Sequence, residues 1–450
     1  MIFRNKTFNF ILANIIFLKR LTLILILIFF FNNYYAQIID GGNGHALILD
    51  KKGNVWTVGR NNFGQLGDST LINSSLPKKV KNIPNIIAIS RGYDHSIALT
   101  TNGELYLWGR NNYGQLGCIS ALDQLTPQKL PNHKNFVAIE GGQWHTLALK
   151  NDGTVWAWGH NFYAELGNGN REHSSKPTQV IQVSNSKYTQ LQDVVSIASV
   201  GNHNLVLKKD GTVWGWGGNT FKEVGRNAEV FQKYAIKIEG IPKIKEIAVG
   251  WHHSIALDYN GTIWAWGSDP SSQFKEETLK YYERPVEFKG YPIFTKIACG
   301  SWHSLAIDIN KNVWGWGKNH YGMLGIGDTI SHSVPILISK LKNITIIGGG
   351  CFESLAVDTF GKIFSFGDNP SGQLGIENFQ RFTTPQLMCI NMDGVVTSKT
   401  KKIITIKEQA IPKTPTYLFN IDFILKILKY LILLVSISLN IFLFKKLKSY

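Results

Sequence analysis

Hydrophobic and polar residues alternate on both sides of short polar turns, and this pattern recurs through most of the chain. In residues 95–109, alternating apolar residues flank Asn102 and Gly103. Asn-Gly is favoured in two-residue turns whose residues both adopt positive φ. The pattern predicts an antiparallel β-hairpin at residues 95–109.

Seven hairpins of this kind follow one another. Their first residues are 50, 50, 58, 50, 50 and 50 positions apart, and they are His45, His95, His145, His203, His253, His303 and Glu353. A short apolar strand, such as residues 86–89, precedes each hairpin, and a loop and a proline-led strand follow it. Four strands in about 50 residues make one blade of a β-propeller. The sequence therefore predicts an all-β fold, a seven-bladed β-propeller.

The way the ring closes is a separate prediction. The chain enters its first repeat near Ile38, in the middle of the unit, and residues 385–390 form a last strand with no hairpin after it. We expect this last strand to complete the first unit, so that one mixed blade joins the two ends of the ring.

Four short motifs identify the repeat more closely. They are Gly-Gln-Trp-His-Thr-Leu-Ala-Leu at 142–149, Asp-Gly at 152–153, Val-Trp-Ala-Trp-Gly at 155–159 and Gly-Gln-Leu-Gly at 114–117. Together they resemble the regulator of chromosome condensation repeat, over about residues 38–390. The resemblance implies a seven-bladed propeller in which the repeat histidine is structural.

Three units depart from this motif. The fourth shifts its glycine to Gly201, the fifth lacks the Gly-Gln-Leu-Gly loop after Gly267, and the seventh has Glu353, Phe364 and Phe366 in place of histidine and tryptophan. We expect these blades to be looser or remodelled.

The amino terminus has the features of a secretory signal. Basic residues extend to Arg20, an apolar run covers residues 21–31, and a stretch of polar and small residues ends at Ala36. This order is that of a cleavable export signal. We expect cleavage after Ala36, with an uncleaved membrane anchor as the alternative.

The carboxy terminus contains a long apolar segment. Residues 423–444 carry no charge except Lys426 and Lys429. As a helix they extend about 33 Å, enough for a hydrocarbon core of about 30 Å. They predict one transmembrane helix, with a helix lying on the membrane surface as the alternative. The predicted divisions are a signal peptide (1–36), the propeller (37–398), a basic linker (399–422), the transmembrane helix (423–444) and a cytoplasmic tail (445–450).

Charge is concentrated at these two ends. The chain has a formal net charge of +16, with 47 basic and 31 acidic residues. Residues 1–36 contribute +4 and residues 399–450 contribute +8, whereas residues 37–398 hold 33 basic and 29 acidic residues. A nearly neutral body argues against nucleic acid as a partner.

Six histidines that recur once per repeat raise the question of a metal ring. One histidine per blade places them around a wide circle, whereas zinc requires ligands at about 2 Å. We therefore expect His45, His95, His145, His203, His253 and His303 to be structural, and we predict no metal and no cofactor. Tryptophans that alternate with small residues, as in 156–158 and 214–216, are expected to pack between blades.

A second set of aromatic residues stands just before the repeat histidine or its replacement, where strand alternation does not require an aromatic. These residues are Tyr93, Trp144, Trp251, Trp302 and Phe352. If the turns that carry them share one face, they form an aromatic ring near the central opening. Aromatic residues are enriched in binding hot spots. They are our candidate binding face, and packing against neighbouring turns is the alternative.

Enzyme motifs are missing from the sequence. It has no G-x-S-x-G, P-loop, H-E-x-x-H, EF-hand or C-x-x-C pattern, so we predict no catalytic residues. The four cysteines, Cys118, Cys299, Cys351 and Cys389, fall at different repeat positions. We expect buried free thiols, with a bridge between Cys299 and Cys351 as the alternative.

The sequence thus favours a single-pass, membrane-tethered propeller on the extracytoplasmic side of the cell membrane, holding a protein or a glycan. Two other functions remain open. The resemblance implies a guanine-nucleotide exchange factor for a small GTPase, as in the founding member of the family. An extracytoplasmic propeller enzyme is the third.

The export hypothesis gives a direct prediction. A chain from Gln37 to Ser398 should be a soluble monomer, because it lacks both apolar ends, and size-exclusion chromatography measures this. An insoluble product, together with a full-length chain that folds in the cytosol, would contradict the hypothesis.

Overall fold

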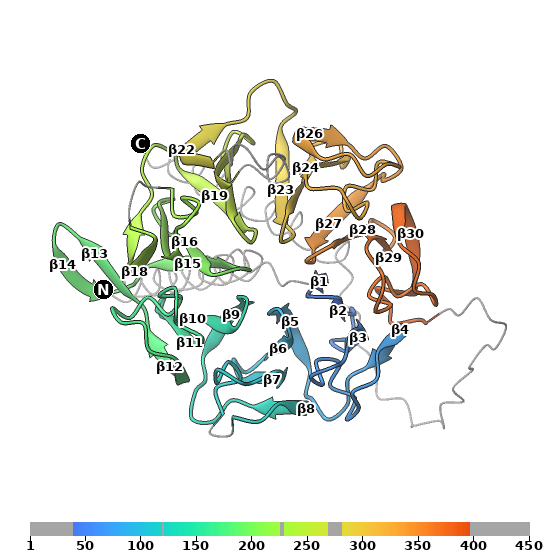
Figure 1. The fold of residues 1–450 in the computed structure, drawn as a ribbon, viewed down its shortest axis with the longest axis horizontal. Coiled ribbons are helices and arrows are strands. Elements are labelled where there is room, and N and C mark those ends of the chain that lie inside the picture. The colour runs from blue at the N-terminus through green and yellow to red at the C-terminus, as the bar shows by residue number, and fades with distance from the viewer. Residues whose placement is uncertain (1–38, 119–120, 226–228, 269–280, 397–450) are drawn as a thin grey trace, which may run out of the picture. The chain divides into compact units, whose positions relative to one another are not determined.

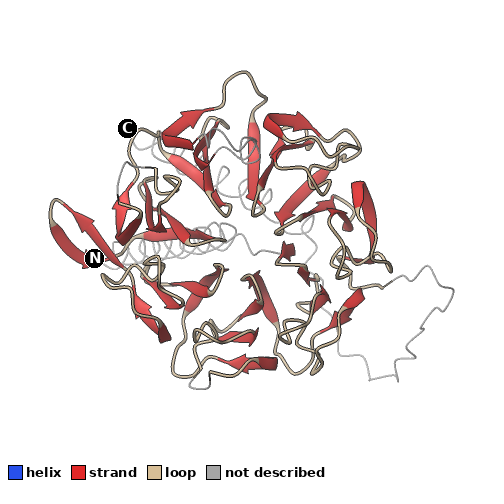
Figure 2. Ribbon diagram, viewed as in Figure 1, coloured by secondary structure: helices blue, strands red, loops and turns tan. Residues whose placement is uncertain are grey.

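Seven β-sheets stand around a central axis like the blades of a propeller (Figure 1). The structure is a computed structural model that describes residues 39–118, 121–225, 229–268 and 281–396. In these residues it has strands and connecting loops but no helix (Figure 2). The predicted all-β, seven-bladed propeller is confirmed. The predicted signal and transmembrane helix lie outside the described residues.

Each blade uses consecutive strands of the chain. The first blade consists of β1 (Ile39–Gly41), β2 (His45–Leu49), β3 (Val55–Gly59) and β4 (Ser74–Lys79). The second consists of β5 (Ile86–Arg91), β6 (His95–Thr100), β7 (Leu105–Gly109) and β8 (Gln124–Lys129). The third consists of β9 (Phe136–Gly141), β10 (His145–Lys150), β11 (Val155–Gly159) and β12 (Ser174–Gln179). The fourth has β15 (Val194–Ser199), β16 (His203–Lys208), β17 (Val213–Gly218) and β18 (Phe231–Lys237), with an added hairpin of β13 (Ile181–Ser184) and β14 (Lys187–Gln190).

The last three blades follow the same plan. They are β19 (Ile244–Val249), β20 (His253–Asp258), β21 (Ile263–Ser268) and β22 (Tyr281–Glu287); β23 (Phe294–Cys299), β24 (His303–Asp308), β25 (Val313–Gly317) and β26 (His332–Leu337); and β27 (Ile344–Gly349), β28 (Glu353–Asp358), β29 (Lys362–Gly367) and β30 (Phe382–Asn391). The short apolar strand lies nearest the axis and the proline-containing strand lies at the rim.

The predicted hairpins form the middle of each blade. In the second blade β6 pairs with β7 from His95↔Gly109 to Leu99↔Leu105. Gly103 in the connecting turn has φ of 72°, a conformation that glycine adopts without a steric penalty.

The predicted mixed blade is wrong. β1 pairs with β2 inside the first blade, and β30 pairs with β29 inside the seventh. Residues 39–41 supply the first blade with an inner strand of its own, so no strand has to come from the other end of the chain. The first and seventh blades meet instead through a buried apolar cluster, in which Ile48 packs with Leu355 and Ile390. Loop contacts add to it: Cys351 N donates to Gly42 O and Lys51 N donates to Met392 O.

The hydrophobic core lies between neighbouring blades. One cluster, for example, joins Leu47 and Val55 of the first blade to Ile89 and Trp108 of the second. Trp108 is fully buried, and its Nε1 donates to Gln65 O in the loop of the first blade. Trp216 and Trp266 make the equivalent bond to the loop of the blade before them. The tryptophans therefore pack between blades, as predicted.

The repeat histidines join the same neighbours. The Nε2 atom of His303 lies 2.7 Å from Ser354 Oγ in the next blade. This hydroxyl donates to Met323 O, in a loop of the blade that carries His303. Because the hydroxyl proton is used on the carbonyl, the imidazole must be the donor to Ser354. The other five histidines face a hydroxyl or amide oxygen of the next blade in the same way, at Ser96, Thr146, Asn204, Ser254 and Ser304.

The junction between the seventh and first blades lacks this arrangement. Glu353 replaces the histidine, Ala46 stands where the next blade should offer a hydroxyl, and Val58 stands where five other blades have tryptophan. Glu353 Oε2 accepts a bond from Phe352 N, whereas the buried Oε1 has no hydrogen-bond partner.

A buried arginine spans this junction. Arg91 of β5 lies with its Nε 3.3 Å from Asp40 Oδ1 of the first blade, and its Nη2 donates to Gly349 O of the seventh at 2.8 Å. One side chain of the second blade thus connects the two blades that the histidine contact does not join.

The fourth blade is remodelled, as expected, and the change is at its outer edge. Six outer strands carry a proline at the equivalent position, and proline removes a free backbone N–H from an exposed edge. These residues are Pro77, Pro127, Pro177, Pro285, Pro335 and Pro385. β18 has Ala235 there, and the added hairpin covers it through the parallel pairing Gln182↔Ala235. This hairpin is the insertion behind the 58-residue interval.

Glu353 predicts a pH dependence of stability. Burial raises the pKa of this carboxyl from 4.5 to about 8. The unfolded chain therefore releases the proton at lower pH than the folded chain, and the free energy of unfolding should fall, by at most about 5 kcal/mol, as pH rises from 4.5 to about 8. The Glu353→Gln variant should lose this part of the pH dependence, when the free energy of unfolding is measured by urea titration at each pH. An unchanged pH dependence would show that Glu353 does not titrate in the junction.

Candidate functional site

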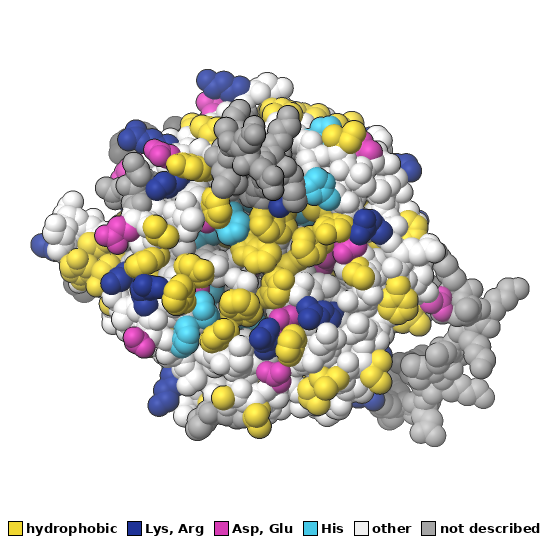
Figure 3. Space-filling view, viewed as in Figure 1, with side chains coloured by type: hydrophobic (Ala, Val, Ile, Leu, Met, Phe, Trp, Pro, Cys, Tyr) yellow, Lys and Arg dark blue, Asp and Glu magenta, His cyan; other side chains and the backbone are white. Residues whose placement is uncertain are grey.

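The turns that join the innermost strand of each blade to the next strand share one face of the propeller. This is the face seen in Figure 3, where hydrophobic side chains gather at the centre with histidine, basic and acidic side chains around them. The five predicted aromatics are on these turns and are all half-buried. They occupy two positions: Tyr93 and Trp251 lie two residues before the repeat position, and Trp144, Trp302 and Phe352 lie one residue before it.

Four of the five aromatics converge. Tyr93 of the second blade and Trp251 of the fifth have ring centroids 5.6 Å apart, although their blades are not neighbours in the ring. Tyr93 also contacts Trp144 at 6.5 Å, and Trp251 contacts Trp302 at 5.1 Å. These separations are typical of interacting aromatic rings. We call these four residues the aromatic centre.

Phe352 has a different neighbour. Its ring packs edge-on against Tyr321 of the loop in the sixth blade, with centroids 5.1 Å apart. The described ring contacts join it to no member of the aromatic centre. The structure thus separates Phe352 from the other four predicted residues.

Gly201 explains how Trp251 reaches the centre. A Cβ atom at residue 201 would lie 2.6 Å from Trp251 Cδ1, too close for any side chain to fit without movement. The glycine shift that marks the fourth unit as irregular in sequence therefore makes room for the tryptophan of the fifth.

Basic side chains surround the aromatic centre. They occupy the position after the glycine that ends the third strand of four blades, at Arg60, Arg110, His160 and Lys318. Lys318 Nζ lies 3.6 Å from the centroid of the Trp302 ring, and burial lowers the pKa of this lysine to about 8. A cation near the face of tryptophan is attracted by the ring quadrupole.

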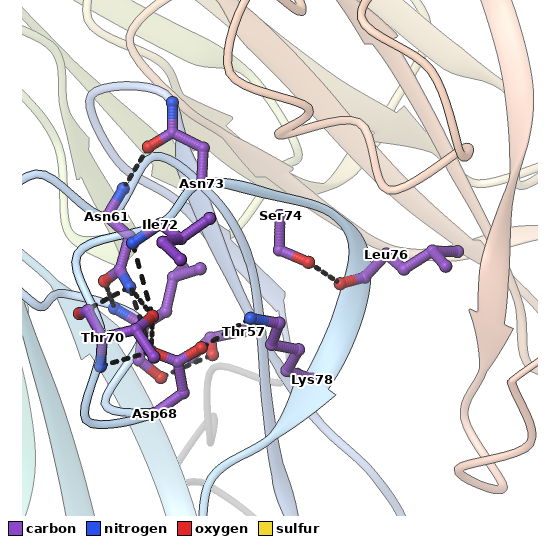
Figure 4. Close-up of polar contacts among 10 residues, drawn as sticks. Thr57, Asn61, Asp68, Thr70, Ile72, Asn73, Ser74, Leu76 and Lys78 are labelled. Atoms are coloured by element: carbon purple, nitrogen blue, oxygen red, sulfur yellow. Dashed lines mark hydrogen bonds and ion pairs between the residues drawn. The ribbon is translucent and has the colours of Figure 1, made fainter.

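A polar loop fixes the backbone next to Arg60. The side chain of Asn61 is fully buried; its Oδ1 accepts from Leu66 N at 2.9 Å and its Nδ2 donates to Asp68 Oδ1 and Thr70 O (Figure 4). An asparagine at the same place accepts from the residue five positions later in the other blades whose loops are described, at Asn111, Asn161, Asn219, Asn319 and Asn369. These asparagines were not among the predicted site residues, although their regular spacing from the glycine is visible in the sequence.

Two histidine and glutamate pairs also lie on this face. His160 Nδ1 is 2.7 Å from Glu165 Oε1, and His252 Nδ1 is 3.3 Å from Glu223 Oε1. Each glutamate replaces the glutamine of the Gly-Gln-Leu-Gly loop, and this substitution was the signal that could have revealed the pairs. Both carboxylates are buried, so each holds its imidazole in a fixed orientation.

The repeat histidines are not part of this face. They are buried between blades, and desolvation lowers the pKa of His45, His95 and His303 to about 3, so these rings stay neutral at physiological pH. Across the described ranges, no group of three or more His, Cys, Asp or Glu side chains could hold a metal ion.

The cysteines form no bridge. Cys299, Cys351 and Cys389 are buried free thiols, and Cys118 is a partly exposed one. The expectation of buried free thiols is therefore confirmed for three of the four, and the alternative bridge between Cys299 and Cys351 is wrong.

Within the part of the chain that the structure describes, no helix has the length and apolar character that crossing a membrane requires.

Family profiles match most of the propeller. The profile described as an RCC1-like domain matches residues 185–410, which is half of the chain. The regulator of chromosome condensation (RCC1) repeat matches residues 52–99, 102–149 and 152–207. No curated protein matches the sequence significantly.

Solved propellers share the fold. Human WBSCR16 is 20% identical with a TM-score of 0.65, over 74% of this chain and 93% of that protein. Prp20p from Saccharomyces cerevisiae is 21% identical with a TM-score of 0.65, over 76% of this chain and 87% of Prp20p. Yeast RCC1 (Prp20) bound to Kap60 is 21% identical with a TM-score of 0.66, over 79% and 88%. The matched repeats and the seven blades they build show that this chain belongs to the regulator of chromosome condensation repeat family.

Proposed function

We propose that this protein is a binding module whose aromatic centre captures a protein partner outside the cell membrane, to which the carboxy-terminal segment tethers it. The observation that carries the proposal is the convergence of Tyr93, Trp144, Trp251 and Trp302 on one face. A structural aromatic would need no exposure, yet all four remain half-buried rather than enclosed.

Physical reasons connect such a cluster to protein recognition. Aromatic side chains bury a large area and lose little conformational entropy when a partner covers them, so they dominate many interfaces. Ring contacts among the four residues hold them in place before any partner arrives. A preorganised surface of this kind loses less entropy on binding.

The cellular location of the protein is inferred from its two terminal segments. Residues 1–36 have the composition of an export signal, and residues 423–444 are long and apolar enough for one membrane span. An exported propeller would meet its partner at the outer surface of the membrane.

Nucleotide exchange is the second candidate. Prp20p, whose fold is the one found here, has binding properties toward Gsp1p and histones. A cytosolic location of the full-length chain would favour this candidate, and export would remove the propeller from a cytosolic GTPase.

The binding proposal predicts that the aromatic centre can be removed without unfolding the protein. The variant with Trp144, Trp251 and Trp302 all replaced by Ala should keep a cooperative unfolding transition, because none of the three is fully buried. Recovery of partner proteins crosslinked on intact cells, measured by quantitative mass spectrometry, should fall at least about tenfold.

A matched control removes three aromatics elsewhere. Tyr188, Tyr259 and Phe360 are strongly exposed and lie away from the aromatic centre. Their triple replacement by Ala should leave partner recovery unchanged. Equal partner recovery by the parent protein, the tryptophan variant and the control variant would contradict the proposal. Loss of folding in the tryptophan variant would show that the aromatic centre is structural.

A further inference from the structure

We propose that the partner docks through a protein segment that places a carboxylate between Arg60 and Arg110 and an apolar side chain on the aromatic centre. This inference rests on the proposed function and adds the chemistry of the partner. Three observations on the face support it: the geometry of the arginine pair, the distribution of charge, and the shape of the aromatic cluster.

The arginine pair is held ready around one internal carboxylate. Arg60 Nη1 lies 3.5 Å from Asp94 Oδ1, and Arg110 Nη1 lies 3.2 Å from Asp94 Oδ2. Both guanidinium groups also lie close to the ring of Phe63, at 5.7 and 4.6 Å from its centroid. Two side chains, one from the first blade and one from the second, thus supply one fixed cationic pair.

One carboxylate cannot neutralise two guanidinium groups. Each arginine reaches Asp94 through a single nitrogen, whereas a guanidinium has five N–H donors arranged to bind carboxylates. The side chain of Asp94 is 2% exposed, and those of Arg60 and Arg110 are each 27% exposed. The negative charge is therefore below the surface, and the surplus positive charge is at the surface.

Three further carboxylates on this face are similarly withdrawn or paired. Glu165 and Glu223 are buried against His160 and His252. Asp368 lies 3.1 Å from Arg381. Exposed carboxylates do occur on this face, in the loops between the third and fourth strands, at Asp123, Glu172, Glu229 and Asp328. Beside the aromatic centre itself, however, the exposed charge belongs to the cations Arg60 and Arg110 at Asp94, and Lys318 lies at Trp302. Complementarity requires a negative group on the partner.

The adjacent aromatic centre defines the second requirement. Tyr93 directly precedes Asp94, so the carboxylate site and the aromatic cluster are contiguous. The rings of the centre meet at angles between 53° and 76°, and they cover one another's faces and edges instead of forming parallel platforms. Nucleic-acid bases stack on open parallel faces, whereas aliphatic and aromatic protein side chains fit an angled cluster.

The test uses the full-length chain, immobilised through a carboxy-terminal tag, and a phage-displayed library of random peptides about 12 residues long. We expect the selected peptides to contain Asp or Glu next to an aromatic or large aliphatic residue. The Arg60→Gln/Arg110→Gln variant should select peptides that keep the apolar residue and lose the acid. A selected peptide should bind this variant about 10- to 100-fold more weakly than the parent protein.

A matched control removes the same charge from the opposite face. Lys134 and Lys209 are exposed and lie beside the turns at the other ends of the blades. The Lys134→Gln/Lys209→Gln variant should select the same peptides as the parent and bind them equally. Equal loss in both variants would show a general charge effect and overturn the proposal.

Further outcomes separate this inference from the proposed function. Peptides with an apolar anchor but no acid, lost only in the Trp144, Trp251 and Trp302 variant, would overturn the carboxylate site and leave the binding face intact. Binding of a fluorescent single-stranded DNA about 12 nucleotides long, lost in the arginine variant and stronger than that of any peptide, would identify nucleic acid and overturn the proposal.

Discussion

The contact between the repeat histidine and the next blade is the interaction on which the rest of the structure depends. A single four-stranded sheet leaves its large apolar side chains exposed on its faces, and these side chains need a neighbouring blade to cover them. Each histidine sets the position of that neighbour, because its Nε2 meets an oxygen of the next blade. At four junctions this oxygen is a hydroxyl that in turn donates to the loop of the preceding blade, as at His303 and Ser354. Directional bonds and the buried tryptophans together fix the angle between blades, and this angle brings the turns of all seven to one face.

The junction between the first and seventh blades obeys the same constraint in another way. Glu353, Ala46 and Val58 remove the usual contacts there, and Arg91 supplies a link from the second blade to Gly349. A ring needs every junction, because one open junction exposes the apolar surfaces on both sides of it. Closure without a shared strand is therefore compatible with a stable ring when an apolar cluster, a buried charged side chain and backbone hydrogen bonds connect the two ends.

Periodicity was sufficient to predict the seven blades, the hairpins and the packing of tryptophan between blades. The mixed blade was wrong because three residues, 39–41, are too few to show a periodic pattern, yet they pair as a strand. For the site, the sequence identified five aromatics but not which of them meet. Phe352 has the same place in the repeat as Trp144 and Trp302, yet its ring packs against Tyr321 because the contact depends on what each neighbouring loop offers. The arginine pair also needed three dimensions, since Arg60 and Arg110 meet at Asp94 only when two blades stand side by side.

The central claim is that the face carrying the aromatic centre is the surface that meets the partner. The most direct measurement places a photo-crosslinking amino acid at Tyr93 or, in a separate protein, at Lys209 on the opposite face, in the full-length chain on intact cells. We predict a discrete covalent adduct of one mass from position 93 after illumination and none from position 209. Adducts from position 209 alone, or the same adducts from both positions, would contradict the account.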